Sequence, residues 1–255
     1  MKLRNLIAAD LRRALLSWRF LFSACGVALM MFSAVSGLLK NASSIWYLMD
    51  LSLGGSGMAS MILCILPVFA FGISFAKEWE EKAVNFWIIR TGVVRYTISK
   101  IIVSFISGFL TIAMGMAIFI FVLRPWFPLF LDLSADYSYE ALMEQGHVFF
   151  GILLYVMHFG LSGALTAVCA MWLSTYLPNR FVATVSPVVL DFTVPRITGR
   201  MELPPYLNPV FWVEAIYSVP SPAATFLIKL VTILILCCLI CIATILQMKR
   251  RIGHA

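Results

Sequence analysis

Six long apolar runs constrain this 255-residue chain more than any other feature of its sequence. A helix that crosses the hydrocarbon core of a bilayer needs about 20 residues, at about 1.5 Å of rise per residue. Hydrophobic residues make up 62% of the chain and charged residues only 12%, against about 45–50% and about 25% in soluble domains. Such a chain cannot cover a water-facing surface with polar groups. The sequence therefore predicts an all-α integral membrane protein with six transmembrane helices.

The fifth apolar run differs from the others because it is short and rich in proline. The stretch between Arg180 and Pro195 is shorter than the about 20 residues that an untilted span needs. We therefore expect a short helix from Phe181 to about Val194, followed by broken or re-entrant pieces. In the second run we expect a kink at Pro67. The predicted spans are residues 20–39, 51–76, 101–123, 148–177, 181–203 (with the re-entrant elements) and 223–248.

Basic residues flank the predicted spans unevenly. If the N-terminus is cytoplasmic and all six runs cross, most of the 19 lysines and arginines lie on the cytoplasmic side. The positive-inside rule then predicts a multi-pass protein of the plasma membrane with both termini in the cytoplasm. The net charge of +7 follows from this asymmetry, so we expect no nucleic-acid partner. The outer loop before the fourth span is acidic instead, with Asp132, Asp136, Glu140 and Glu144.

Residues 1–18 alternate apolar and basic side chains with the period of a helix. The arginines and Lys2 fall mostly on the face opposite the leucines. A helix of this kind lies in the plane of the membrane interface, with its basic side toward lipid headgroups and water. The sequence therefore predicts an N-terminal interfacial helix. Its apolar face comprises Leu3, Leu6, Ile7, Leu11, Ala14, Leu15 and Trp18.

The most polar long stretch, FAKEWEEKAVNFWIIRTGVVRYTISK (residues 75–100), lies between the second and third spans. Acidic side chains near the start of a helix and a basic one near its end complement the helix dipole. Gly92 supplies a stop signal. We therefore predict one amphipathic helix over residues 77–91 on the cytoplasmic surface. One face would carry Trp79, Ala83, Phe86, Trp87 and Arg90.

Motifs for catalysis and cofactor binding are missing from the sequence. The glutamate pair Glu80-Glu81 would fit the EExxxR pattern of CAAX-processing proteases, but Asn85 occupies the arginine position. HExxH, GxSxG and the phosphate-binding GxxxxGK[ST] do not occur. Cys238 and Cys241 form a CxxC without the second pair of ligands that a tetrahedral metal site needs. We therefore expect no enzyme activity, and no metal or cofactor bound by this chain.

His158 and Asp191 are the ionisable residues that we expect to lie at membrane depth. Ionisable groups at membrane depth often serve function, so the two form a candidate intramembrane polar site. A neutral histidine hydrogen-bonded between helices is the simpler explanation for His158. Asp191 can instead pair with Arg196 or mark the outer end of a short helix.

The layout resembles that of the permease subunits of type-2 ABC transporters (the ABC-2 family). The resemblance rests on the amphipathic lead-in AADLRRALLSWRF, on YLNP (206–209) before the last span, and on the charged stretch. Two positions depart from the family pattern: Ala83-Val84 replaces Gly-Thr, and Gly92 stands where proline is common. In the charged stretch the matching elements are Phe75, Glu78, Glu81, the 83–90 helix, Gly92, Arg95 and Lys100.

The resemblance implies a coupling helix that docks on a separate ABC ATPase subunit. ATP and magnesium would be bound by that partner, and two permeases, as a homodimer or a heterodimer, would join two ATPases. The complex would export an amphipathic substrate (a peptide, drug or lipid) by alternating access. The coupling residues that it implies are Glu78, Trp79, Glu80, Glu81, Phe86, Trp87, Arg90 and Arg95.

Two other functions remain open at this stage. The acidic outer loop suggests a membrane immunity or sensing protein that binds a toxic peptide without ATP. Ion-coupled secondary transport is a third reading, but it needs intramembrane charges beyond His158 and Asp191.

Overall fold

The computed structural model describes residues 3–55, 61–131, 138–198, 204, 207–213 and 216–253, and all regular structure in these residues is helical. The all-α prediction is thereby confirmed. The α-helices are α1 (Leu3–Leu15), α2 (Trp18–Val35), α3 (Ile45–Asp50), α4 (Ser74–Glu80), α5 (Val84–Thr91), α6 (Val93–Leu123), α7 (Ser138–Glu144), α8 (Val148–Ser174), α9 (Arg180–Thr198), α10 (Pro209–Val213) and α11 (Pro222–Gly253). Shorter elements are the 3-10 turn η1 (Leu39–Asn41) and the π-helical η2 (Leu51–Gly55), η3 (Met61–Ile65) and η4 (Val68–Gly72).

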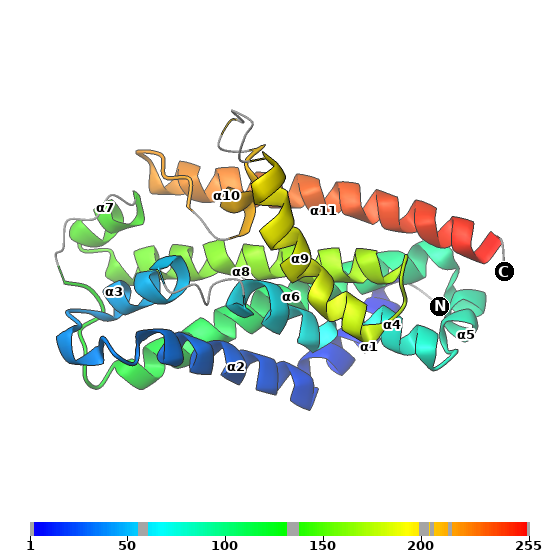
Figure 1. Ribbon diagram of the computed structural model, residues 1–255, viewed down its shortest axis with the longest axis horizontal. Coiled ribbons are helices and arrows are strands. Elements are labelled where there is room, and N and C mark those ends of the chain that lie inside the picture. Colours follow the sequence, from blue (N-terminus) through cyan, green and yellow to red (C-terminus); the bar gives the residue numbers. More distant parts are fainter. Residues whose placement is uncertain are drawn as a thin grey trace.

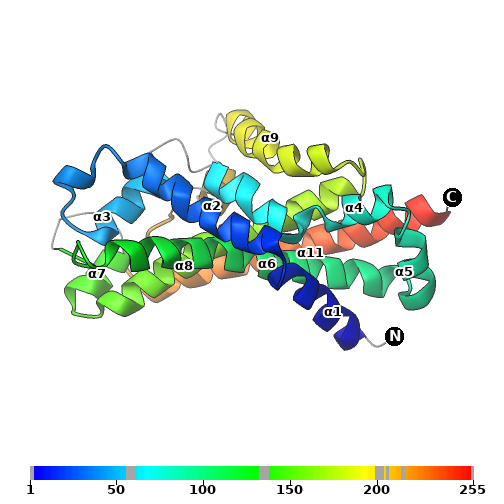
Figure 2. The same ribbon diagram turned by 90° about the horizontal axis from the view of Figure 1, so that it is seen from below.

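The long helices α2, α6, α8 and α11 run along the long axis of the molecule (Figures 1 and 2). Both termini lie at one end of this bundle together with α5, and α3 and α7 lie at the other. In the described residues, five helices are long and apolar enough to cross a membrane, or six if the bent pair at 61–80 forms one span. The chain is a multi-pass membrane protein.

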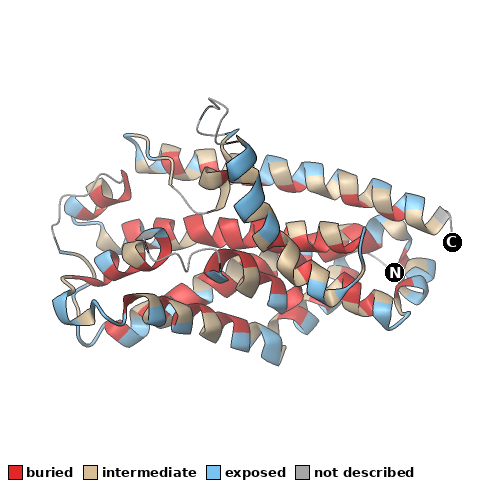
Figure 3. Ribbon diagram, in the orientation of Figure 1, coloured by how far each residue is buried: buried red, intermediate tan, exposed pale blue. Residues whose placement is uncertain are grey.

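The centre of the bundle is formed by α6 and α8, whose residues are the most buried of the long helices (Figure 3). The two helices approach closely where Gly108 faces Gly163. A Cβ atom on Gly108 would lie 2.4 Å from the carbonyl oxygen of Gly163. Small residues at such a crossing let two membrane helices pack backbone to backbone. This crossing sets the distance between the two central helices.

The second span is the one that breaks. It consists of π-helical segments and ends in a 46° bend between Gly72 and Ser74. Pro67 cannot donate to the carbonyl of Leu63, four residues earlier, and the Thr166 hydroxyl of α8 donates to that carbonyl instead (2.8 Å). The predicted kink at Pro67 is therefore displaced: α8 satisfies the backbone there, and the chain bends at Ile73.

The prediction that the fifth span stops near Val194 is wrong, because α9 continues through Pro187 and Pro195 to Thr198. The Ser186 hydroxyl donates to the carbonyl of Ala183 (3.4 Å), which Pro187 leaves without its helical partner. The helix crosses the bundle obliquely and ends near its middle (Figures 1 and 2). The short helix α10 and the non-helical residues 216–221 follow. Residues 199–203 and Tyr206 of the YLNP element lie outside the described residues.

Substituting Gly108 by alanine tests the α6–α8 crossing. We expect Gly108→Ala to lower the free energy of unfolding by about 1–3 kcal/mol, because the new methyl group overlaps the backbone of α8. The measurement is the midpoint of thermal unfolding in detergent. Gly37→Ala is the matched control, since a Cβ at Gly37 meets nothing within 4 Å. Equal midpoints for the two variants would contradict the proposed packing.

Candidate functional site

Three charged side chains from three helices meet in the interior near the end that holds the termini. Asp10 of α1, Glu78 of α4 and Lys100 of α6 are only 3%, 5% and 2% exposed. The Lys100 ammonium lies 2.6 Å from Glu78 Oε1 and 3.2 Å from Asp10 Oδ1. We call these three residues the buried charge cluster. One cation therefore ties α1, α4 and α6 together.

Hydrogen bonds and aromatic rings complete the surroundings of the buried charge cluster. The Tyr96 hydroxyl donates to Glu78 Oε2 (2.7 Å), and the Ser99 hydroxyl donates to Asp10 Oδ2 (2.9 Å). The Lys100 ammonium also lies 5.0 Å from the ring centroid of Phe71 and 5.4 Å from that of Tyr96. Each carboxylate thus has both a cation and a hydroxyl donor. A buried ionic group stabilises a fold only when it is satisfied in this way.

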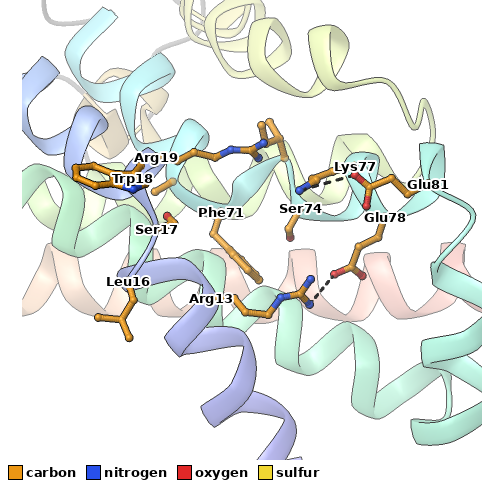
Figure 4. Close-up of a pocket in the computed structure, with 12 residues that line it drawn as sticks. Arg13, Leu16, Ser17, Trp18, Arg19, Phe71, Ser74, Lys77, Glu78 and Glu81 are labelled. Atoms are coloured by element: carbon orange, nitrogen blue, oxygen red, sulfur yellow. Dashed lines mark ion pairs between the residues drawn. The ribbon is translucent and has the colours of Figure 1, made fainter.

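At the rim of the buried charge cluster, Arg13 adds a second cation. Its guanidinium lies 3.5 Å from Glu78 Oε1 and 3.9 Å from Asp10 Oδ1, and its side chain is 56% exposed (Figure 4). The two acids and two bases balance in charge.

The buried position of Asp10 was not predicted, although the spacing of residues in α1 indicates it. Leu6, Asp10 and Ala14 are spaced by four residues and are the buried residues of α1. An acidic residue in the middle of an apolar face must have a buried partner. The sequence does not say which of the distant basic residues supplies it.

Glu78, for which the resemblance implies contact with a partner ATPase, lies inside the molecule and is paired with Lys100. Because α4 begins inside the membrane span, at Ser74, Glu78 falls on the face that packs against α1 and α6. Its role is to position α4. The sequence pattern could not distinguish a charge that faces water from a charge that is neutralised in the interior.

Four other predicted coupling residues make contacts within the chain. Arg180 at the start of α9 lies 2.5 Å from Glu80 Oε2 and 3.8 Å from Glu81 Oε1. Trp79 stacks under Arg251 of α11 (4.2 Å), and Trp87 lies under Arg13 (5.8 Å). These contacts join α4 and α5 to α1, α9 and α11.

The predicted single helix over residues 77–91 is in fact two helices. α4 ends at Glu80, a turn follows in which Lys82 has a positive φ of 57°, and α5 begins at Val84. Breaking the helix changes its phase, so Trp79 and Phe86 do not share a face as predicted. The side chain that joins Phe86 on the outside is Ile89, which the sequence analysis missed.

The outer side of α5 and the start of α6 forms a surface of apolar and basic side chains. Phe86 is 72% exposed and Ile89 is 83% exposed, and Arg90 of α5 and Arg95 of α6 are exposed as well. We call these four residues the coupling surface. It lies at the end of the bundle that holds both termini (Figure 1).

Gly92 joins α5 to α6 with a φ of +80°, a conformation that strains any residue with a side chain. Its N–H donates to the carbonyl of Ile88 (2.8 Å), and the Thr91 hydroxyl donates to that of Trp87 (2.7 Å). These bonds close the end of α5. The position where proline is common in ABC-2 permeases is thus occupied here by a residue with a positive φ.

His158 and Asp191 do not share one intramembrane site. His158 of α8 is buried, with its Nδ1 3.0 Å from the Tyr139 hydroxyl, and it lines a cavity together with Lys229. Asp191 of α9 lines a separate, mostly apolar pocket between α8, α9 and α10. Trp212 contributes to the lining of both.

Lys229 is a buried residue that the sequence analysis did not assign to a site. It lies in α11 with 5% exposure, and its ammonium donates to the backbone carbonyls of Phe211 (2.7 Å) and Trp212 (2.8 Å). These carbonyls belong to α10, and the last carbonyls of a helix lack intrahelical donors. Lys229 therefore fastens α10 to α11.

Potential metal ligands do not gather in the described residues: no group of three or more His, Cys, Asp or Glu side chains is close enough to hold an ion. Comparison with protein-family models, curated proteins and solved structures gave no match. The chain's own residues and geometry therefore carry the functional assignment.

Removing the cation tests the buried charge cluster. We expect Lys100→Met to lower the free energy of unfolding by about 3–5 kcal/mol, because it leaves two carboxylates buried without their cation. Thermal unfolding in detergent measures the change. Arg95→Met, on the exposed part of the same helix, should change stability by less than about 0.5 kcal/mol.

A triple variant separates charge from packing. Asp10→Asn, Glu78→Gln and Lys100→Met together should recover most of the lost stability, since no buried charge remains unpaired. A triple variant as unstable as Lys100→Met alone would show that the loss comes from packing around Lys100.

Proposed function

We propose that this chain is the permease subunit of an ATP-driven ABC exporter in the cell membrane, with both termini in the cytoplasm. It works with a separate ATPase subunit and moves an amphipathic substrate by alternating access. The resemblance of the charged stretch to the coupling region of ABC-2 permeases supports the proposal. So does the multi-pass helical architecture.

The observation that carries the proposal is the coupling surface. Exposed apolar side chains on a long membrane helix face lipid, but Phe86 and Ile89 project from a short helix at the end of the bundle. Large apolar groups flanked by arginines are typical of protein interfaces, where aromatic residues and arginine supply much of the binding energy. A water-soluble partner at this end satisfies both kinds of side chain.

The partner subunit binds and hydrolyses ATP in the proposed complex. The sequence has no phosphate-binding GxxxxGK[ST] loop, so ATP and magnesium are assigned to the partner subunit. Two copies of this chain, or this chain and a related one, would complete the translocation pathway with two ATPases.

The contacts of α4 and α5 provide a route for movement from the partner into the bundle. Glu78 and Lys100 fix α4 to α6, and Asp10 fixes α1 to the same cation. Displacement of α5 would thus move the ends of α1, α4 and α6 together. The tight α6–α8 crossing at Gly108 would pass the movement to the centre of the bundle.

An alternative is an immunity or sensing protein that binds a toxic peptide at its acidic outer loop without ATP. Glu140 of that loop is buried, with an exposure of 2%, and accepts a hydrogen bond from Trp46 Nε1. It belongs to the interior and not to a peptide-binding surface. Asp132 and Asp136 lie outside the described residues. The coupling surface therefore favours the permease.

Truncating the coupling surface tests the proposal. The chain is co-expressed with an ABC ATPase from the same cell, and the complex is purified in nanodiscs. We expect Phe86→Ala/Ile89→Ala to weaken association at least about tenfold, since two exposed interface residues are lost. ATPase activity per complex should fall in parallel.

Phe149→Ala provides the control, because Phe149 is 77% exposed but lies at the start of α8, at the opposite end of the bundle. It should leave association unchanged. Normal assembly of the Phe86/Ile89 variant would remove the coupling role. Full biological activity of the wild-type chain in cells without the ATPase would favour the ATP-independent alternative.

A further inference from the structure

An open pocket of about 400 Å³ lies where the α1–α2 elbow faces η4 and α4 (Figure 4). Its walls come from the end of α1, the start of α2, the last residues of the broken second span and the first turns of α4. These elements lie beside the buried charge cluster, and Glu78 contributes to both. The four residues of the coupling surface do not line this pocket.

Three basic side chains from three elements line the pocket: Arg13 of α1, Arg19 of α2 and Lys77 of α4. In Figure 4, Arg19 and Lys77 extend into it from opposite sides, and Ser74 lies below Lys77. Arg19 is exposed and forms no ion pair with any described residue. The Ser74 hydroxyl is buried without a hydrogen-bond partner in the described part of the chain.

The two acids of the pocket are shared between basic residues inside and outside it. Glu78 is paired with Lys100 at 2.6 Å. Glu81 lies 3.8 Å from Arg180 as well as 3.8 Å from Lys77. Counted together, the four bases Arg13, Lys77, Lys100 and Arg180 balance the four acids Asp10, Glu78, Glu80 and Glu81. Arg19 is in excess of these pairs and gives the pocket one net positive charge.

The rim of the pocket is apolar and exposed. Leu16 is 85% exposed and Trp18 is 73% exposed, at the elbow where the amphipathic α1 meets the membrane-spanning α2. Tryptophan at such a position sits at the level of lipid headgroups. The pocket thus combines a cationic interior with a rim suited to the glycerol and acyl regions of a lipid.

We propose that this pocket binds the phosphate headgroup of an anionic phospholipid. Arg13, Arg19 and Lys77 contact the phosphate, the Ser74 hydroxyl donates to it, and Leu16 and Trp18 pack against the apolar part of the lipid. Basic pockets between helices on the cytoplasmic side of membrane proteins suit such headgroups. The proposal concerns a lipid site and does not depend on transport.

Lipid binding at this site would act on the buried charge cluster through Arg13. The Arg13 guanidinium faces the pocket and also lies 3.5 Å from Glu78 Oε1. A phosphate there would join α1, α2 and α4, so the lipid composition of the membrane would influence how firmly these helices hold together.

Native mass spectrometry of the full chain in detergent tests the site, with phosphatidylglycerol and phosphatidylcholine of identical acyl chains as probes. We expect the wild-type chain to bind phosphatidylglycerol at least about tenfold more tightly, since the choline ammonium of phosphatidylcholine cancels the charge of its phosphate and is repelled by the basic side chains of the pocket. Arg19→Gln/Lys77→Gln should weaken phosphatidylglycerol binding about tenfold and leave phosphatidylcholine binding unchanged. Both side chains are solvent-accessible, so the fold should tolerate the change.

Arg12→Gln is the matched control, because Arg12 lies on α1 beside Arg13 and is exposed but does not line the pocket. It should alter binding by less than twofold. Equal affinity of the wild-type chain for the two lipids would overturn the proposal, and so would equal losses in Arg12→Gln and the double variant. Displacement of the lipid by inorganic phosphate at the same concentration would overturn the assignment to a lipid.

Discussion

The Lys100 ammonium, buried between the carboxylates of Asp10 and Glu78, is the interaction on which the arrangement at the terminal end of the bundle depends. Taking an ion out of water costs several kcal/mol, and only close opposite charges and complete hydrogen bonding offset this cost. Here the partners come from α1, α4 and α6, which are distant in sequence. None of the three helices can move away alone without leaving a charge unpaired.

This constraint divides the charged stretch between the second and third spans into two parts with different roles. Glu78, Glu80 and Glu81 are bound to basic residues of the chain itself and hold α4 in place. Phe86 and Ile89 are apolar, form no such ion pairs and are exposed on α5. A surface that receives force from a partner needs both a rigid base and an accessible face.

Hydropathy predicted the class of the protein and the positions of most membrane helices, because the bilayer requires long apolar helices whatever their neighbours are. In residues 75–100 the sequence did not predict which charged side chains are buried, or where the helical phase changes. The turn at Lys82 changes the helical phase of the residues that follow it, so Ile89 was missed. Glu78 comes before this turn and is buried because α4 begins inside the second span. The pairing of Asp10 with Lys100 depends on tertiary contacts between distant segments, which a single sequence does not encode locally. Likewise, the carbonyls freed by prolines in the second span and α9 are satisfied by hydroxyl groups, one of them from another helix.

The central claim is that the buried charge cluster holds α1, α4 and α6 as one body, with α5 joined to α4 by the short turn at Lys82. A distance distribution measures this directly. Spin labels are placed at Arg12→Cys on α1 and Ile89→Cys on α5, with the six native cysteines replaced, and double electron–electron resonance is recorded in nanodiscs. The account predicts one narrow distance distribution for the chain with Lys100 and a broad one with Lys100→Met. A distribution that stays equally narrow without the Lys100 ammonium would contradict it.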